Sequence, residues 1–264
     1  MKLAGIILLF WIVAALASSW LGLSPDAIHL DKILAQADAT AWLGYDDLGR
    51  DLLARLLTGV GVSLTVAVVV TSCTLLLGTA LGLVAGYYGG CLDRLLLQVT
   101  DVFLAFPGIL LAIAFAAVLG PGLGNLIVAL CLTSWVGYAR LTRAQTLSLR
   151  SRQHVLAAKA LGAPDARILL HHVLPLLAAP LLVEMTFGIA SLVIAEASLS
   201  FLGLGIQAPH ASWGAMLRDG VRYLLVAPHY VLAVGLSLMS LVLAVNMLGD
   251  RMRDAWDVKG SRPV

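Results

Sequence analysis

The stretch "AAKALGAPDARILLHHVLP", residues 157–175, interrupts a sequence that is otherwise strongly apolar. Helix-forming residues fill positions 151–161, and Gly162 fits the left-handed position that follows a helix C-terminus. Pro164 then suits the first turn of a new helix. The pattern predicts two short helices, over 151–161 and 164–173, that meet at an angle.

The composition is that of an integral membrane protein. Of the 264 residues, 60% are hydrophobic and 12% are charged, and the mean hydropathy is +0.95, a balance that excludes a water-soluble domain. The formal charge of +2 gives no reason to expect nucleic acid as a partner. The three cysteines are far apart in sequence, and His29, His210 and His229 are separate and resemble no ligand set, so neither a disulfide framework nor a metal site is predicted.

Six apolar runs predict an all-α protein with six transmembrane helices, because about 20 apolar residues are needed to cross the hydrocarbon. The first run exceeds the apolar part of a signal peptide and is interpreted as a retained span. "GPGLGN" separates the third and fourth runs as a tight turn. The predicted spans are 1–20, 62–86, 102–119, 126–141, 174–197 and 230–248.

The basic residues orient these spans. Most of the 17 lysines and arginines lie in segments that share a side with the N-terminus, so the positive-inside rule predicts that both termini are cytoplasmic. Residues 157–175 then face the cytoplasm between the fourth and fifth spans. The basic residues predicted on this side are Lys2, Arg94, Arg140, Arg143, Arg150, Arg152, Lys159, Arg167, Arg251, Arg253, Lys259 and Arg262.

Two outer segments have distinct patterns. Asp47, Arg50, Asp51 and Arg55 follow a spacing of i, i+3, i+4 and i+8, which predicts an interfacial amphipathic helix. It serves either as a platform for an external partner or as a lead-in to the second span.

The stretch "SFLGLGIQAPHASWG", residues 200–214, is too rich in glycine and proline for a regular helix. Its aromatic residues Phe201 and Trp213 suit a membrane interface. Irregular backbone at this depth must be covered by protein or line a cavity. The stretch is interpreted as a re-entrant or surface segment at the outer mouth of a pathway, with a plain connecting loop as the alternative.

Acidic residues inside the spans need a partner or a cavity. Glu184 lies near the middle of the fifth span, where a lone charge costs roughly 2.5–3.5 kcal/mol on insertion scales. It either lines a pathway or forms a buried hydrogen bond between helices. Glu196 has a weaker claim to the same role. Asp93 and Asp101, close to Arg94, are expected to form local ion pairs.

Residues 157–175 resemble the coupling loop, or EAA loop, of ABC-importer permeases, with Gly162 at the family glycine and His172 to Pro175 at its H-x-L-P. In that family the loop docks in a cleft of a cytoplasmic ATPase. Leu156 occupies the family's glutamate position, which removes the salt link that a glutamate would make. For an arbitrary membrane protein, a merely solvated loop is the alternative. The residues assigned to coupling by this resemblance are Arg152, Leu156, Ala157, Ala158, Lys159, Gly162, Ala163, Pro164, Asp165, Arg167, His172 and Pro175.

Four further stretches resemble the dipeptide, oligopeptide and nickel branch of these permeases, in particular its C-type subunit. They are "WLGYDDLGRDLLARLLTGVGVSL" (42–64), "YYGGCLDRLLLQVTDVFLAFP" (87–107), "EASLSFLGLGIQAPHASWGAML" (196–217) and "NMLGDRMRDAWD" (246–257). Together the five stretches cover nearly the whole chain in the family's order.

The resemblance implies a type I ABC-importer permease fold in the bacterial inner membrane. Residues 1–58 would hold the first span and the outer amphipathic segment, and residues 59–264 the core permease domain with its coupling loop at 143–173. A second, homologous permease, two ATPase subunits and an extracytoplasmic solute-binding protein are the implied partners. The implied pathway residues are Glu184, Glu196, Ser200 and Phe201, and the implied docking residues for the outer partner are Asp47, Arg50, Asp51 and Trp213.

No G-x-x-x-x-G-K-[ST] motif is present, so the chain is not expected to be an enzyme, and ATP and Mg²⁺ are expected on a partner chain. The substrate, either a peptide or nickel or a metal–chelator complex, is not determined by these motifs. Two other classes of function stay open. One is an autonomous secondary transporter or channel that uses Glu184, and the other is a membrane scaffold.

Overall fold

The computed structural model describes residues 2–18, 20, 22–39 and 41–260, without the side chains of Lys2 and of residues 257–260. Three basic side chains used above to predict the orientation, those of Lys2, Lys259 and Arg262, therefore lie outside the described part. The regular secondary structure of the described residues is helical apart from one isolated β-bridge, between Tyr45 and Asp51. The chain divides into two compact units, each of which collects segments that are far apart in sequence.

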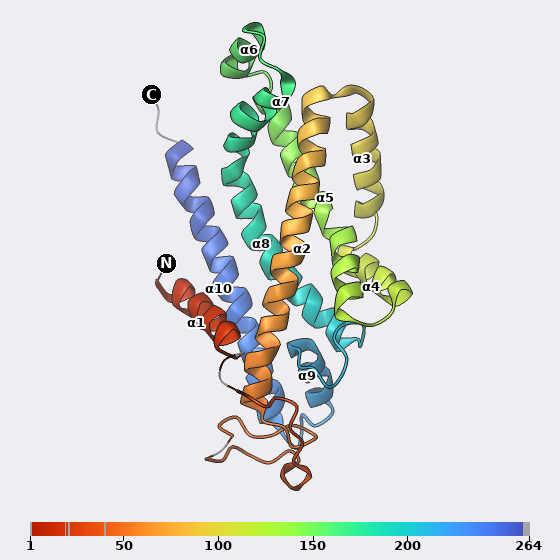
Figure 1. The fold of residues 1–264 in the computed structure, drawn as a ribbon, viewed down its shortest axis with the longest axis vertical. Helices are drawn as coiled ribbons and strands as arrows, with labels where there is room; N and C mark the ends of the chain where they lie inside the picture. Colours follow the sequence, from red (N-terminus) through yellow and green to blue (C-terminus); the bar gives the residue numbers. More distant parts are fainter. Residues whose placement is uncertain (1, 19, 21, 40, 261–264) are drawn as a thin grey trace. The chain divides into compact units, whose positions relative to one another are not determined.

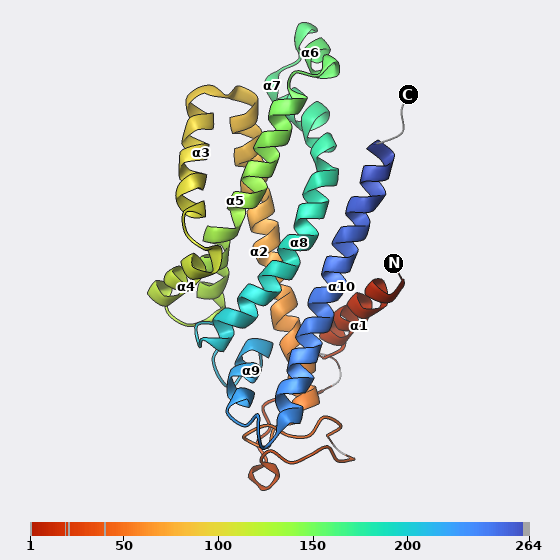
Figure 2. The ribbon, with the colours of Figure 1, turned by 180° about the vertical axis from the view of Figure 1, so that it is seen from behind.

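Four long helices of the described chain contribute residues to these units (Figures 1 and 2). They are α2 (Leu52–Tyr88), α5 (Leu123–Leu149), α8 (Leu174–Phe201) and α10 (Pro228–Gly260). The shorter elements are α1 (Lys2–Ser18), η1 (Leu30–Lys32), α3 (Gly90–Leu104), α4 (Gly108–Leu119), α6 (Gln153–Ala160), α7 (Asp165–Arg167), the π-helix η2 (Ile168–Val173) and α9 (Trp213–Val221).

The first unit comprises residues 1–69, 113–129 and 189–248. Its core is centred on Trp213, whose ring makes an edge-to-face contact with Trp11 at a centroid distance of 5.0 Å. The indole of Trp11 donates to Ser240 Oγ (2.9 Å) and that of Trp213 to the carbonyl of Leu56 (2.9 Å). Both indole N–H groups thus have the partner that a buried tryptophan needs.

Helix α9 packs closely in this unit, against the end of α8 and the start of α10 (Figure 2). A Cβ atom on Gly214 would collide with the carbonyl oxygen of Ala197, and one on Gly220 would crowd the ring of Tyr230. Ser212 begins the helix as an N-cap that accepts a hydrogen bond from the N–H of Ala215 (3.2 Å).

The second unit comprises residues 70–112, 130–188 and 249–264. Gly78, Gly82 and Gly86 recur at every fourth residue of α2 and face the backbone of α5. An added Cβ at each of them would collide with α5, at Trp135, Ala139 and Arg143 in turn. Small residues at this spacing are typical of close helix pairs in membranes, because the backbones themselves can touch.

The number of spans differs from the prediction of six. Among the described residues, four helical stretches are long and apolar enough to cross a membrane, and a fifth is added if a bent pair of helices counts as one span. The four are Leu52–Tyr88, Leu123–Leu149, Asp165–Phe201 and Pro228–Trp256. The first predicted span forms the 17-residue apolar helix α1, which is shorter than these four, so the prediction of six spans is not confirmed.

The predicted third span, 102–119, is broken. Helices α3 and α4 meet at an angle of 86°, and the break falls just before Pro107. The cause is local, because a proline disfavours helical backbone at the residue before it and has no N–H to continue the helix.

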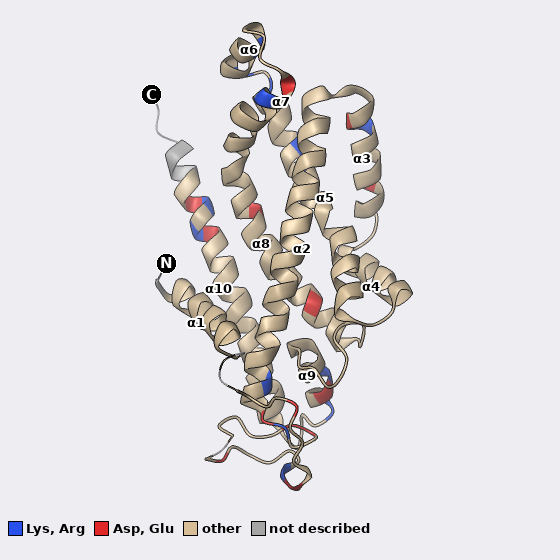
Figure 3. Cartoon of the chain, viewed as in Figure 1, with Lys and Arg blue, Asp and Glu red and all other residues tan. Residues whose placement is uncertain are grey.

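Charged residues gather in a few elements, as Figure 3 shows. They concentrate in the loop before α2, in α9, α3, α7 and residues 250–254 of α10, whereas most of the long helices carry few charges. Helix α8 carries two carboxylates, Glu184 and Glu196.

The predicted domain boundary at residue 58 falls inside α2. The division into residues 1–58 and a core domain of residues 59–264 stays a prediction.

Candidate functional site

The segment predicted as two short helices is a folded element of the second unit. Helix α6 ends where Gly162 adopts φ +79°. The N–H of Ala163 donates to the carbonyl of Ala158 (3.1 Å) and that of Gly162 to the carbonyl of Lys159 (3.0 Å). These two bonds form a Schellman motif, so the predicted left-handed C′ role of Gly162 is confirmed.

The second predicted helix is not separate from the fifth span. Pro164 is the N-cap of α7, which continues as the π-helix η2 and then as α8. Pro175 lies within the first turn of α8 and does not end the helix. The N–H of Leu174 bonds to the carbonyl of Leu169, five residues earlier, and such π-turns are one way in which a helix accommodates a local disturbance.

The inner face of this segment is packed against the second unit. Val155, Ile168 and Val173 are buried in a cluster with Leu83, Tyr138, Leu149, Leu169, Leu177 and Leu181. Ala158 and Ala163 are half-buried against the same cluster. A connector with its own apolar core is not a merely solvated loop.

Polar contacts also hold the segment. The hydroxyl of Tyr87, at the end of α2, donates to Asp165 Oδ1 at 2.8 Å. Arg150 Nη1 donates to the carbonyls of Gly86 (3.1 Å) and Tyr87 (3.3 Å), which are left free at the C-terminus of α2. The end of α2 is thereby bonded both to α7 and to the residue after α5.

A bidentate ion pair joins α3 to α5. The guanidinium of Arg143 bonds to both oxygens of Asp93, through Nε to Oδ1 and through Nη2 to Oδ2 (2.7 Å). Asp101 pairs with Arg140 Nη1 at 2.9 Å. The predicted ion pairing of these two aspartates exists, but their partners are on α5 rather than at the neighbouring Arg94.

The outer face of the segment is open. Leu156 is 51% exposed and Leu161 is 88% exposed. Leu161 is not a member of the predicted coupling set. Besides Leu156, the exposed residues of that set are Arg152, Ala157, Lys159, Gly162, Pro164, Arg167 and Pro175, while Asp165 and His172 are half-buried.

Glu184 lines a pocket of about 680 Å³ in the second unit. No hydrogen bond to Glu184 is formed within the described residues. The pocket also contains the polar side chains of Gln145, Arg152 and Arg253, and its remaining wall is formed by Leu141, Leu149, Leu176, Ala179, Pro180, Val183, Phe187 and Trp256. The structure thus favours the interpretation of Glu184 as a residue in the wall of a pocket over that of a buried hydrogen bond between helices.

Glu196 has the opposite environment. Its side chain is buried in the first unit, where it accepts hydrogen bonds from Ser63 Oγ (2.6 Å) and Ser200 Oγ (2.8 Å). This carboxylate links α2 to α8. Because the side chains of Glu196 and Ser200 are both buried and cannot contact a solute here, we withdraw these two residues from the predicted pathway set. Phe201 is 39% exposed and lines a smaller apolar pocket of the first unit.

The predicted amphipathic helix before α2 is wrong. Residues 46–49 form a turn, with Gly49 at φ +71°, and the helix starts only at Leu52. Asp46 Oδ1 accepts the N–H groups of Leu48 (2.9 Å) and Arg50 (2.8 Å), and Asp51 Oδ1 accepts that of Leu53 (2.8 Å). Aspartates at these positions favour a turn and a helix cap over helix interior.

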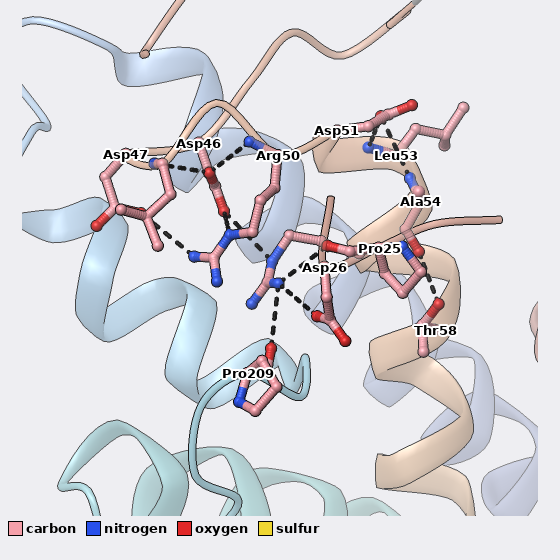
Figure 4. A network of polar contacts seen from close by, with 12 residues as sticks. Pro25, Asp26, Asp46, Asp47, Arg50, Asp51, Leu53, Ala54, Thr58 and Pro209 are labelled. Atoms are coloured by element: carbon pink, nitrogen blue, oxygen red, sulfur yellow. Dashed lines mark hydrogen bonds and ion pairs between the residues drawn. The ribbon is translucent and has the colours of Figure 1, made fainter. Parts of the chain in front are cut away.

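This turn carries a buried charge network, shown in Figure 4. The carboxylate of Asp46, which has no exposed area, pairs with Arg50 Nε (2.6 Å) and Arg55 Nε (3.3 Å). Arg55 Nη1 also donates to the carbonyls of Pro25 (3.1 Å) and Pro209 (3.3 Å) and to Asp26 (3.2 Å). One guanidinium thus ties together three segments of the first unit that are far apart in sequence.

The outer docking set changes accordingly. Trp213 has no exposed area and Arg50 is 6% exposed, so their side chains are structural and we do not retain them as contacts for a partner. Asp47 and Asp51 are half-buried at the surface, and their docking role stays a prediction. Burial, followed by the carboxylate of Asp46, raises the pKa of Asp47 above its ordinary value of 3.8.

Sequence reasoning missed several residues that build the site. The sequence patterns predict no role for Asp46, Tyr87 or Gly82. A signal was present in two cases. An aspartate four residues before an arginine and followed by glycine is typical of a charged turn, and glycines at every fourth position of an apolar helix indicate close packing.

The chain resembles known proteins along most of its length. Residues 78–257 match the family described as "Binding-protein-dependent transport system inner membrane component". The dipeptide transport system permease protein DppC of Alkalihalophilus pseudofirmus is 45% identical over 221 residues, which are 84% of this chain and 73% of that protein. The glutathione transport system permease protein GsiD is 40% identical in Pectobacterium atrosepticum, over 97% of this chain and 86% of the relative.

A solved structure shows the same fold. The inward-facing MetNI methionine ABC transporter superimposes with a TM-score of 0.57 at 22% identity, covering 76% of this chain and 95% of the other. The fold, the folded connector between α5 and α8, and the sequence matches together define a membrane permease subunit of the ABC-importer class. The chain belongs to the family of binding-protein-dependent transport system inner membrane components.

Proposed function

We propose that this protein is one of two permease subunits in an ATP-driven importer of short peptides in the bacterial inner membrane. A second, homologous permease would complete the pathway, an extracytoplasmic binding protein would deliver the solute, and two ATPase subunits would bind and hydrolyse MgATP. The relatives are named for dipeptide and glutathione transport, which supports peptides over nickel or metal–chelator complexes.

The observation that carries this proposal is the folded α6–α7 segment. Its inner face is packed and bonded to the ends of α2 and α5, and its outer face is open. Because α7 continues through η2 into α8 without a break, a displacement of the segment would move α8 directly. Rigid helical connections of this kind transmit motion between sites.

Glu184 supports the placement of the pathway. A carboxylate on the wall of a pocket of about 680 Å³, with no hydrogen bond from the described residues, is suited to meet water or a solute. The pocket is of the size that small-molecule sites generally have. We assign Glu184 to the solute pathway on this basis.

The test is reconstitution in proteoliposomes. The chain is co-purified with a second permease, ABC ATPase subunits and a binding protein from the same organism, and uptake of labelled dipeptide, glutathione and Ni²⁺ is measured with and without ATP. We expect ATP-dependent uptake of the peptides, which is lost when the catalytic carboxylate of the ATPase is replaced. Uptake by this chain alone, without ATP, would support an autonomous transporter and contradict the proposal.

A further inference from the structure

The pocket around Glu184 contains charges of both signs, and this combination indicates the kind of ligand that it takes. One carboxylate, Glu184, and two guanidinium groups, Arg152 and Arg253, line the same cavity of about 680 Å³ in the second unit. We propose that the pocket binds a short peptide through its two charged ends, with Glu184 at the α-ammonium group and Arg253 at the α-carboxylate. The inference rests on the proposed function, because the peptide is the imported solute.

Glu184 and Arg253 do not neutralise each other. Among the side chains that the structure describes, neither of them forms a salt bridge or a hydrogen bond. A charge without a partner on a membrane-spanning helix is costly and generally marks a functional site. A carboxylate and a guanidinium that share a cavity without meeting leave space for a ligand that carries the two opposite charges.

The two helices that carry these residues touch close to them. A Cβ atom on Gly249 of α10 would lie 2.4 Å from Thr186 Oγ1 of α8. Glu184 is two residues from Thr186, about 3 Å along the axis of α8, and Arg253 is one turn from the contact, about 6 Å along α10. The axial offset between the two residues is therefore at most about 9 Å. A peptide of two or three residues spans this offset, because an extended chain covers about 3.3–3.6 Å per residue.

The carboxylate of Glu184 also lies against α5. A Cβ atom on Gly137 would lie 3.2 Å from Glu184 Oε1, so a side chain at this position would crowd the carboxylate. Gln145, two turns further along α5, lines the same cavity. Its amide can donate to and accept from the peptide group of a ligand.

The rest of the lining suits the apolar parts of a peptide. It contains the aromatic rings of Phe187 and Trp256 together with aliphatic side chains of α5 and α8. A few placed polar groups within an apolar lining are the general design of small-molecule sites. Such a pocket recognises the charged ends of a peptide and tolerates variation in its side chains.

Free Ni²⁺ is the other class of solute that the sequence motifs leave open. Within the part of the chain that the structure describes, no group of three or more His, Cys, Asp or Glu side chains could hold a metal ion. The two guanidinium groups of the pocket also repel a cation. The charges of the pocket therefore favour a zwitterion over a free metal ion.

The experiment measures binding to the transporter in nanodiscs, assembled with the second permease and the ATPase subunits but without the binding protein, so that only the membrane part selects the peptide. The probe is the dipeptide alanyl-p-benzoylphenylalanine, whose side chain attaches covalently to nearby residues on illumination. We expect labelling within 141–152, 176–187 or 253–256, suppressed by unlabelled alanyl-alanine. N-acetyl-alanyl-alanine and alanyl-alanine amide, each of which lacks one charged end, should compete about tenfold less well.

Substitutions assign each end of the peptide. Glu184→Gln should abolish the preference for a free amine and keep the preference for a free carboxylate, and Arg253→Gln should do the reverse. Because each preference is a ratio between two competitors, it does not depend on the folded fraction, and a merely structural role would leave both ratios unchanged. Arg251→Gln, at an exposed arginine of the same helix outside the pocket lining, is the matched control and should alter neither preference.

Two results would overturn the inference. One is labelling outside these three ranges, and the other is a pair of preferences that neither Glu184→Gln nor Arg253→Gln alters. Uptake distinguishes this failure from that of the proposed function. ATP-driven import of dipeptides with no labelling of the pocket refutes the inference alone, whereas the absence of ATP-driven import refutes the proposed function.

Discussion

The hydroxyl of Tyr87 donates a 2.8 Å hydrogen bond to the carboxylate of Asp165 across 78 residues of sequence. It connects the last turn of α2 to the first residue of α7. The segment that we propose to meet the ATPase is therefore bonded to α2 as well as continuous with α8. Motion of this segment would reach two long helices at once.

We predict that Tyr87→Phe loosens α7 without unfolding the protein. Loss of a hydrogen bond to a charged group costs about 1.5–3 kcal/mol when the carboxylate cannot be rehydrated, and less here because Asp165 is only half-buried. Amide exchange over 165–173 should accelerate, and ATP hydrolysed per solute imported should rise.

The control for this prediction is Tyr88→Phe, because the structure gives the hydroxyl of Tyr88 no such bond within the described residues and the ring is 53% exposed. A double-mutant cycle with Asp165→Asn isolates the pair. If Tyr87→Phe and Asp165→Asn have additive effects on exchange, the bond does not couple the two helices.

We predict that Gly162→Val uncouples ATP hydrolysis from uptake while membrane insertion stays intact. An added Cβ at Gly162 would meet no atom within 4 Å, so the obstacle is the backbone conformation at φ +79°. A left-handed residue other than glycine costs roughly 1–2 kcal/mol, and more for a β-branched one. The measurements are ATPase activity and uptake in the same proteoliposomes.

Gly162→Asn is the matched variant, because asparagine tolerates the left-handed region better than valine does. It should retain most of the coupling. Equal uptake by the valine and glycine proteins would show that the turn between α6 and α7 does not need a fixed angle.

Some of this architecture could be predicted from the sequence, and the reasons are local. Gly162 and Pro164 specify a turn through their own backbone preferences, so the break between α6 and α7 was found at the right residues. The charge spacing over 47–55 predicts a helix that does not form before Leu52, because Asp51 prefers a capping position. The third span was predicted as one helix because an apolar run conceals the effect of Pro107.

Sequence patterns do not predict the contacts between segments that are far apart in the chain. The sequence around a carboxylate such as Glu196 does not distinguish a residue that lines a cavity from one that is enclosed by hydroxyl groups. Its partner Ser63 lies 133 residues away, and only the packing of α2 against α8 in the first unit brings them together. The same holds for Tyr87 and Asp165 in the second unit.

We predict that Asp46→Ala strongly destabilises the first unit. The substitution removes a carboxylate without exposed area and leaves the guanidinium groups of Arg50 and Arg55 buried without it. Breaking a buried ion pair from one side costs about 3–5 kcal/mol. Thermal unfolding in detergent should show the loss, and Asp31→Ala, at an exposed aspartate, should leave the midpoint unchanged. A change below about 1 kcal/mol would contradict the structural role given to the network.

We predict that Asp47→Asn stabilises the protein at neutral pH. Because the pKa of Asp47 is raised above 3.8, the folded state binds the proton more tightly than the unfolded state does. The ionised carboxylate therefore lowers stability above the folded pKa, and this deficit disappears as the pH falls below 3.8. Unfolding midpoints compared at about pH 7 and about pH 4 should show a larger advantage of the variant at neutral pH, because the deficit is partly lost at the lower value. An advantage of equal size at both values would mean that charge is not its cause.

We predict that the two carboxylates of α8 respond oppositely to removal of their charge. Glu184 lines a pocket and accepts no hydrogen bond from the described residues, so Glu184→Gln should leave thermal stability unchanged and lower ATP-driven peptide uptake several-fold. Glu196 is enclosed by Ser63 and Ser200, so Glu196→Ala should lower stability by about 1–3 kcal/mol through the unpaired hydroxyls and the lost packing. Both variants are measured for unfolding midpoint and for uptake per folded transporter. If Glu196→Ala reduces uptake per folded molecule at an unchanged midpoint while Glu184→Gln does not, the pathway runs past Glu196 and the assignment made here is reversed.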